Sequence, residues 1–173
     1  MDQVALLVIR AQLGDRRALT RLVEHWHERL WRYVHRMVGP AADDVTQQAW
    51  VAALAGLPRL RQPERFAAWL FVIARRAVMD HLRLRYAAPE PLDTEPPDER
   101  DDLDAMLDRT RIDAGLALLP PLEREVLELF HLQDLTLLDC AEILGVPPGT
   151  VKSRLFRARR MLRDRLTEKG SPS

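Results

Sequence analysis

The sequence predicts an all-α protein made of two small helical domains joined by an acidic, flexible linker. Apolar residues recur at three- and four-residue steps almost throughout the chain, which is the spacing of one face of an α-helix. No stretch alternates with period two for long enough to predict a strand. The helical pattern is interrupted over residues 88–104, where four prolines and a run of acids replace apolar residues. We therefore expect a first domain over residues 1–87 and a second over residues 105–173.

The first two helices of the first domain are bounded by glycines. The initial helix spans about Gln3–Leu13 and ends at Gly14. The second helix carries an apolar stripe over Leu19–Met37 and ends at Gly39, because glycine suits the left-handed position that follows the last helical turn.

A shorter helix and a second long helix complete the first domain. The shorter one runs over about Asp43–Ala55 and is closed by Gly56. Pro63 opens the long one, at a position where its missing N–H costs no hydrogen bond. The predicted core stripe of this helix consists of Phe66, Trp69, Leu70, Ile73, Ala77 and Leu84.

The second domain resumes the helical pattern near Ala105. The linker before it cannot bury enough apolar surface to order itself. Pro120-Pro121 starts a helix, Thr136 caps the next one, and Gly145 ends that one. A tight turn and a final Arg-rich helix follow, so the last two helices form a helix-turn-helix.

Charge is distributed unevenly along a chain whose formal net charge is zero. Residues 1–86 carry 14 Lys and Arg against 8 Asp and Glu, and residues 146–173 carry 8 against 2. Residues 87–113 have the opposite balance, with 3 basic against 10 acidic side chains. Two basic segments separated by an acidic one indicate contact with nucleic acid.

The composition and the motifs exclude several classes of protein. Cys140 is the only cysteine, so no internal disulfide can form, which fits a reducing compartment and a cytoplasmic protein. Cys140 lies among apolar neighbours and is predicted to be a small buried hydrophobe. The early apolar run, Val4–Ile9, is too short for a signal peptide or a membrane span, so we expect no membrane insertion. Because the sequence has no HExxH motif, no paired-cysteine spacing and no glycine-rich phosphate loop, we expect no catalytic residue, no metal and no cofactor.

The most specific motif is the helix-turn-helix over Leu135–Leu166, with the sequence LTLLDCAEILGVPPGTVKSRLFRARRMLRDRL. Val146, Val151 and Leu155 are expected to pack inward. An Arg-rich helix fits the major groove of DNA, where a guanidinium group makes a bidentate contact with guanine. The alternative is a solvated basic helix without a ligand. The candidates for DNA contact are Thr150, Lys152, Ser153, Arg154, Arg157 and Arg160.

A second basic constellation surrounds the long helix with the sequence FAAWLFVIARRAVMDHLRLR. Trp69 and Phe71 can stack on unpaired bases, but aromatic residues at this spacing more often belong to the core. Arginines are better candidates for contacts with phosphates or bases. The candidates on this helix and on the loop before it are Arg61, Arg65, Arg75, Arg76 and Arg83.

A third motif, AADDVTQQAW, places acidic and amide side chains on adjacent turns of the short helix. Carboxylates at the start of a helix commonly cap it and interact with its dipole. On residue physics alone, this capping role is favoured over a binding role. The residues concerned are Asp43, Asp44, Gln47 and Gln48.

The order of these motifs resembles that of bacterial RNA polymerase sigma factors of the extracytoplasmic-function (ECF) class, over nearly the whole chain. DDVTQQAW and FAAWLFVIARRAVMDHLR resemble segments of the family's second conserved region. LPPLEREVLELFHL, followed by AEILGVPPGTVKSRLFRARRMLR, resembles its fourth conserved region almost continuously. The resemblance implies a protein without chemistry of its own, which directs core polymerase to promoters and helps to melt them.

The resemblance also implies a role for each motif. In the family, the short acidic helix docks on the clamp helices of the largest polymerase subunit, which makes Asp43, Asp44, Gln47 and Gln48 docking candidates. The loop around Leu60–Glu64 and the helix after it melt and read the minus-ten element. The recognition helix reads the minus-thirty-five element, and its domain is expected on the flap of the second-largest subunit. The acidic linker is threaded near the path of the nascent RNA, and a cognate anti-sigma factor is expected to inhibit the protein.

Two other classes of function are the alternatives. A stand-alone helix-turn-helix repressor or activator would bind duplex DNA directly, but it needs a ligand-binding or dimerisation module in place of the Arg-loaded first domain. A DNA-processing enzyme needs a catalytic constellation, which the sequence lacks. The sequence therefore predicts a transcription initiation factor whose partners are core RNA polymerase and promoter DNA.

Overall fold

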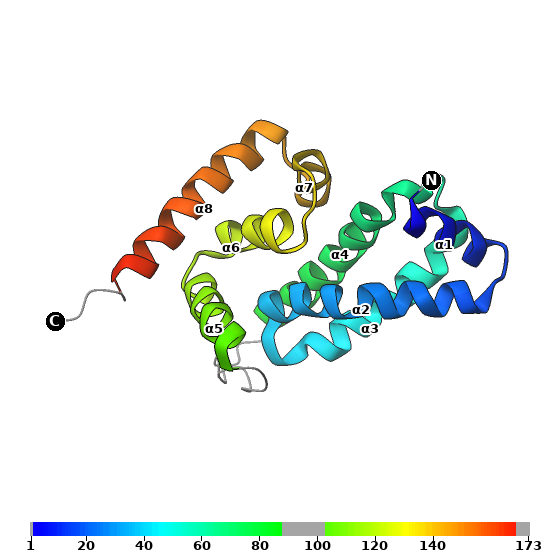
Figure 1. Ribbon diagram of the computed structural model, residues 1–173, viewed down its shortest axis with the longest axis horizontal. Helices are drawn as coiled ribbons and strands as arrows, with labels where there is room; N and C mark the ends of the chain where they lie inside the picture. The colour runs from blue at the N-terminus through cyan, green and yellow to red at the C-terminus, as the bar shows by residue number, and fades with distance from the viewer. Residues whose placement is uncertain (1, 88–102, 169–173) are drawn as a thin grey trace. The chain divides into compact units, whose positions relative to one another are not determined.

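The computed structural model describes residues 2–87 and 103–168, and the side chains of residues 2–85 and 109–168 (Figure 1). The described residues form helices, turns and loops, and none of them forms a strand, as the sequence predicts. The chain divides into two compact units, of which the N-terminal unit contains α1–α4 and the C-terminal unit contains α5, α6, the greater part of α7 and α8. The predicted linker lies outside the described residues except for its last two, 103 and 104, which already belong to α5.

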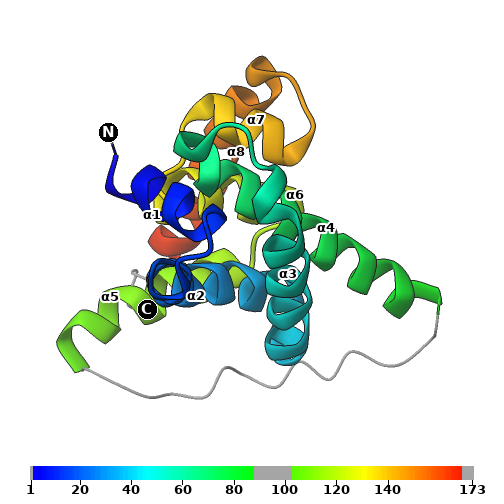
Figure 2. The ribbon, with the colours of Figure 1, turned by 90° about the vertical axis from the view of Figure 1, so that its right-hand side faces the viewer.

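The N-terminal unit is a helical bundle in which α3 packs against both α2 and α4, and α1 packs against α2 (Figures 1 and 2). Gly39 ends α2 with a φ of 62°, in the left-handed region that the sequence predicts for it. The helices are α1 (Gln3–Gln12), α2 (Arg16–Val38), α3 (Ala42–Gly56) and α4 (Phe66–Ala87), and the single turns between them are η1 (Gly39–Ala41), η2 (Leu57–Arg59) and η3 (Pro63–Arg65).

The core of the N-terminal unit is built around aromatic rings. The ring of Trp26 meets those of Phe66 and Phe71 edge-on, with centroids 5.9 and 6.5 Å apart. Tyr33 meets Phe71 in the same manner at 5.5 Å, and both of these residues are fully buried. Edge-to-face pairs of this kind stabilise a core beyond the area that they bury. Because Phe71 is inaccessible, it cannot stack on a base.

The predicted core stripe of α4 is confirmed at Phe66 and Leu70 and wrong at Leu84, which is 75% exposed. Leu84 lies on the same side of the helix as Leu70 by its spacing. However, the last buried residue of α4 among those described is Val78, so Leu84 projects beyond the part of the helix that the bundle covers. The remaining predicted core residues are half-buried: Trp69, Ile73 and Ala77.

The C-terminal unit places a long last helix across two shorter ones. In Figure 1, α7 is joined to the start of α8 by a short turn, and α8 packs on α5 and α6. The helix that begins at Pro121 ends in a π-helical turn, which the sequence did not predict. The elements are α5 (Leu103–Ala117), α6 (Pro121–Leu127), the π-helical turn η4 (Glu128–Leu132), α7 (Leu137–Leu144) and α8 (Pro148–Glu168).

Arg124 connects α6 to the carboxyl end of α5. Its guanidinium group donates hydrogen bonds to the backbone carbonyls of Leu116, Ala117 and Leu119, each at 3.0 Å. The last carbonyls of a helix have no partner within it, so an arginine at this place satisfies them and complements the negative end of the helix dipole. The contact fixes the corner between α5 and α6.

Candidate nucleic-acid interface

The four acidic and amide residues of α3 form one exposed face. The opposite face of the helix is buried through Val45 and Ala49, which are fully inaccessible. This face is called the α3 surface below, and it consists of the exposed side chains of Asp43, Asp44, Gln47 and Gln48.

The sequence favours a capping role for these carboxylates, but neither of them accepts a capping hydrogen bond from the first turn of α3. Ala41 is the N-cap residue of α3, and no side chain caps this end of the helix. Instead, Asp43 accepts a hydrogen bond of 2.7 Å from the indole Nε1 of Trp31, whose ring stacks on His35 with centroids 4.6 Å apart. Asp43 and Asp44 still lie in the first turn, where their charges complement the helix dipole. Asp43 therefore connects α3 to α2, whereas Asp44 is exposed one residue further along.

The arginines predicted for the minus-ten element do not meet at one point. Arg61 is exposed in the irregular segment between η2 and η3, and Arg65 ends η3. Arg76 and Arg83 are exposed on one face of α4, seven residues apart, while Arg75 is half-buried on an adjacent side. From Arg65 to Arg83 the helix rise covers about 27 Å. These residues therefore form a long basic strip and not a compact pocket.

The contacts of Arg83 and Trp69 refine the description of this strip. Arg83 donates a hydrogen bond of 2.9 Å to Asp80 one turn earlier, in a pair so exposed that it stabilises the helix only weakly. Trp69 is half-buried, in line with the interpretation that it belongs to the core. A side chain at Gly56 would lie 3.1 Å from the Trp69 ring, so glycine permits α3 and the ring to approach closely.

The helix-turn-helix is confirmed by its caps and its turn. Thr136 accepts a hydrogen bond of 3.1 Å from the backbone N–H of Asp139, whose carboxylate accepts one of 3.3 Å from the N–H of Thr136. This reciprocal pair is a capping box. Gly145 has a φ of 65° and ends α7 at the predicted turn. Of the three residues predicted to pack inward, Val151 and Leu155 are buried and Val146 is half-buried, which fixes the direction in which α8 presents its other face.

The exposed face of α8 carries four of the six residues predicted for the minus-thirty-five element. They line a shallow, open depression on the helix surface. Thr150 and Arg154 are half-buried at its edge and do not line it. This face is called the α8 surface below, and its depression is lined by Gly149, Lys152, Ser153, Phe156, Arg157 and Arg160.

The sequence reasoning missed Phe156, which is 71% exposed in the middle of the α8 surface. The signal was available in the spacing, because Phe156 follows Ser153 by three residues and precedes Arg160 by four, which places all three on one face. Among the bases, the methyl group of thymine is the partner that such an apolar side chain contacts in the major groove.

Two arginines of α8 have side-chain contacts with the rest of the C-terminal unit. Arg157 donates a hydrogen bond of 3.3 Å to Glu123 of α6, a carboxylate that is 8% exposed. Arg159 donates one of 2.9 Å to the ring Nε2 of His131 and lies 5.6 Å from the centroid of Phe130. Burial and the positive charge of Arg159 lower the pKa of His131. Arg157 and Arg159 thus have partners within the C-terminal unit.

The described residues contain no cluster of three or more His, Cys, Asp or Glu side chains that would hold a metal ion. None of the described helices combines the length and the apolar character that a membrane span requires. Cys140 is fully buried as predicted, and this burial, with the nearby charge of Asp139, raises the pKa of its thiol to about 11. A thiol in this state is a poor nucleophile.

Two family models match the chain, one in each compact unit. The model of sigma-70 region 2 matches residues 22–86, in the unit that carries the α3 surface and the arginines of α4. The model of sigma-70 region 4 matches residues 109–162, which include the helix-turn-helix.

Known sigma factors are similar to the chain over nearly its full length. The ECF RNA polymerase sigma factor SigC of Mycobacterium tuberculosis is 32% identical over 164 residues, which cover 91% of this chain and 88% of SigC. SigW of Bacillus subtilis, also an ECF RNA polymerase sigma factor, is 29% identical and covers 90% of this chain and 92% of its own. Among solved structures, that of CnrH in complex with the cytosolic domain of CnrY has a TM-score of 0.72 at 28% identity, and covers 98% of this chain and 100% of CnrH.

These similarities extend through both units and confirm the family that the motifs indicate. The match to region 2 also decides against a stand-alone repressor, because it assigns the N-terminal unit to the same family as the helix-turn-helix. The chain belongs to the ECF family of RNA polymerase sigma factors, which direct the polymerase to promoters and initiate transcription there.

Proposed function

We propose that the protein acts through one polymerase-docking surface and two DNA-reading surfaces, and that it has no catalytic residue of its own. The observation that carries this proposal is the α8 surface, which is basic and exposed on a helix whose other face is buried. Residues 1–87 form the domain for docking and the minus-ten element, residues 105–173 form the domain for the minus-thirty-five element, and residues 88–104 connect them. Its partners, core polymerase and promoter DNA, place it in the cytoplasm.

The α3 surface is the docking site for the clamp helices of the largest polymerase subunit. Asp44, Gln47 and Gln48 offer a carboxylate and two amides, which suit a partner helix that presents basic and hydrogen-bonding side chains. Val51 continues the same face three residues after Gln48 and is 63% exposed, so it adds apolar area to the contact. Asp43 lies at the edge and orients the start of α3 through Trp31.

The minus-ten element is read by the segment between η2 and η3 and held by α4. Arg61 lies on an irregular segment, which can approach unpaired bases more closely than the side of a helix can. The exposed arginines along α4, Arg76 and Arg83, are spaced for phosphates of the backbone. Arg65 and Arg75 extend the same basic strip.

The minus-thirty-five element is read by the α8 surface in the major groove. Ser153, Arg157 and Arg160 follow one another at three- and four-residue steps, so they reach base edges along one groove. Lys152, Thr150 and Arg154 flank them. The same domain contacts the flap of the second-largest subunit, which keeps α8 at a fixed distance from the minus-ten element.

The acidic linker and an inhibitor complete the proposal. The charge of residues 88–104 suits a basic channel of the polymerase near the path of nascent RNA. CnrH, which is similar over the whole chain, was solved in complex with the cytosolic domain of CnrY. By analogy, a cognate anti-sigma factor binds this protein and blocks its docking and DNA-reading surfaces.

Promoter binding with and without core polymerase tests this proposal. Each DNA-reading surface is small, so the free protein is expected to bind duplex DNA weakly and with strong salt dependence. Core polymerase fixes both surfaces on one promoter, which raises the affinity through effective concentration. The measurement is run-off transcription and filter binding on genomic fragments, at physiological salt. Tight, sequence-specific binding by the free protein would contradict the proposal.

A further inference from the structure

The side chain of Gln12 connects α1 to the segment proposed to read the minus-ten element. Its amide Nε2 donates hydrogen bonds to the backbone carbonyls of Leu57, at 2.9 Å, and Leu60, at 2.8 Å. The contact spans 45 and 48 residues of sequence. Gln12 also lies outside residues 22–86, the stretch that matches the model of region 2. The comparisons therefore assign no role to this residue.

The two carbonyls that Gln12 binds belong to the η2 turn and its C-cap, where the backbone N–H of Leu60 also donates a hydrogen bond of 3.1 Å to the carbonyl of Leu57. Between η2 and η3 the chain leaves helical geometry at Leu60, whose ψ is 113°, and regains it at Pro63. Pro58 and Pro63 have no N–H group to donate. A carboxamide has two N–H donors, and both of those on Gln12 are used here. Gln12 thus adds a second connection between the two ends of the η2 turn, directly before Arg61.

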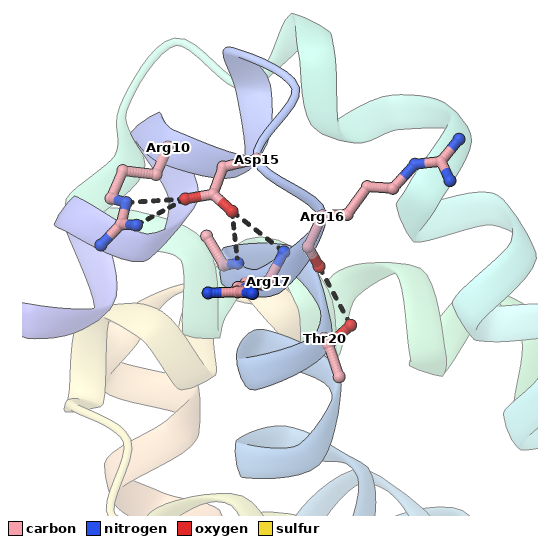
Figure 3. A network of polar contacts seen from close by, with 6 residues as sticks. Arg10, Asp15, Arg16, Arg17 and Thr20 are labelled. Carbon is pink, nitrogen blue, oxygen red and sulfur yellow. Dashed lines mark hydrogen bonds and ion pairs between the residues drawn. The ribbon is translucent and has the colours of Figure 1, made fainter.

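Gln12 is itself fixed, because the end of α1 is tied to the start of α2. Asp15 accepts two hydrogen bonds from the guanidinium group of Arg10, at 2.9 and 2.6 Å, and it caps α2 through the backbone N–H groups of Arg17 and Ala18 (Figure 3). The last turn of α1, which carries Gln12, therefore has a defined place relative to the bundle.

We propose that Gln12 is a positioning residue for minus-ten recognition, which sets the backbone conformation of residues 57–62 and thereby the direction in which Arg61 is presented to DNA. This inference rests on the proposed function, since it requires that the segment reads the minus-ten element. It adds α1 to the parts of the protein that determine promoter preference. Gln12 touches no DNA and acts through the carbonyls of Leu57 and Leu60.

Transcription by reconstituted holoenzyme from a promoter library, randomised in both elements, tests the proposal. Gln12→Met keeps the length of the side chain and removes both donors, Gln12→Lys restores donors, and Gln3→Met changes an exposed glutamine on the same helix. We expect Gln12→Met to lower the discrimination between the best minus-ten sequence and its single mismatches by about fivefold or more, because a net factor of about five is typical for each of the two hydrogen bonds lost. Preference at minus thirty-five should not change, Gln12→Lys should recover most of the loss, and Gln3→Met should match the wild type.

Three outcomes would overturn the inference. The first is an unchanged minus-ten profile in Gln12→Met. The second is an equal loss on every promoter together with a lower melting temperature by tryptophan fluorescence, since Gln12 would then only stabilise the fold. The third concerns Arg61→Ala in the same library: if it leaves the minus-ten profile unchanged, the segment is not the reader, and the proposed minus-ten assignment fails as well. A changed profile in Arg61→Ala with an unchanged one in Gln12→Met refutes the role of Gln12 alone.

Discussion

The two elements proposed to read DNA are held in place by different means. In the C-terminal unit the reader is α8, a regular helix whose backbone hydrogen bonds are internal and whose buried stripe includes Val151 and Leu155. In the N-terminal unit the reader is the segment between η2 and η3, and a side chain from another helix, Gln12, binds the backbone at its start. The position of α8 is therefore expected to depend on substitutions within the helix. The conformation of the segment is expected to depend also on substitutions far away in the sequence.

The regular helix and the irregular segment also differ in the form of DNA that each can contact. A helix presents side chains at regular intervals, and its width fits the major groove of a duplex, where the base edges are exposed. An irregular segment has no such repeat, but its backbone can come close to bases that have left the stack. The contact of Arg157 with Glu123 joins two side chains, while the contacts of Gln12 join a side chain to the backbone of another element.

The largest effect is expected where the helix relies on its buried stripe. Leu155→Ala should lower the free energy of unfolding of the C-terminal unit by about 2–5 kcal/mol, because it leaves a cavity in a small core. The neighbouring change Phe156→Ala, at a side chain that is 71% exposed, should cost less than about 0.5 kcal/mol. Urea denaturation followed by circular dichroism measures both.

Tryptophan fluorescence supplies the control for this experiment, because all four tryptophans belong to the N-terminal unit: Trp26, Trp31, Trp50 and Trp69. Their transition should not move in either variant. Equal destabilisation by Leu155→Ala and Phe156→Ala would show that α8 does not bury the face described above.

A smaller but more selective effect is expected at the arginines of α8. Arg154 and Arg157 are three residues apart near the start of the helix, where side chains reach base edges, whereas Arg163 lies further along and is suited to phosphate. Arg154→Ala or Arg157→Ala should cost about 1–3 kcal/mol at one minus-thirty-five position. Arg163→Ala should weaken all promoters alike and reduce the salt slope by about one.

The promoter library distinguishes contacts with base edges from contacts with the phosphate backbone at these positions. Because Arg157 lies in the α8 surface and Arg154 at its edge, the larger change in preference is expected for Arg157. Equal losses on every promoter for both variants would mean that these arginines hold the backbone, and base reading would then belong to Thr150, Lys152 or Ser153.

The helix bounds and the helix-turn-helix could be predicted from the sequence because their causes are local. Gly39 and Gly145 end helices in the left-handed conformation, and Thr136 caps its helix, each through contacts within a few residues. The exposure of Leu84 could not be predicted in this way. The pattern gives the side of a helix on which a residue lies, but not how far along the helix the neighbouring elements extend.

In the candidate site, too, the features with local causes could be predicted and those that depend on packing could not. The exposed face of α3 and most of the α8 surface follow from helical spacing, and Phe156 could have been found by the same rule. The contact of Gln12 with Leu57 and Leu60 has no sequence signature, since it depends on how α1 packs against the rest of the bundle. The hydrogen bond of Trp31 to Asp43, between two helices, is equally invisible to periodicity.

We expect α3 to resemble α8 in having a buried face that stabilises the fold and an exposed face that binds a partner. Changing Asp44 and Gln47 together to alanine should weaken binding to core polymerase by about tenfold, a typical loss for part of an interface centre. Helix content by circular dichroism should not change. The matched control changes Glu24 and Gln3, an exposed acid and an exposed glutamine of the same unit. If the double variant at α3 binds core polymerase as the wild type does, the charges serve the helix dipole and not a partner.

The smallest effect is expected from acidification, which should lower the stability of the N-terminal unit through Asp15, the residue that connects α1 to α2. Hydrogen bonds from the backbone N–H of Ala18 and from Arg10 lower the pKa of Asp15 below its ordinary value of 3.8. The ionised carboxylate therefore contributes stability above that value, and the contribution is lost as the pH falls through the lowered pKa of the folded protein.

Asp15→Asn retains a good N-cap but loses the charge that binds Arg10. Its tryptophan-fluorescence transition should lie below that of the wild type at pH 7 and converge with it below pH 3.8. If the transitions of Asp15→Asn and the wild type still differ at low pH, the charge of Asp15 does not fix the end of α1, and the position of α1 depends on packing.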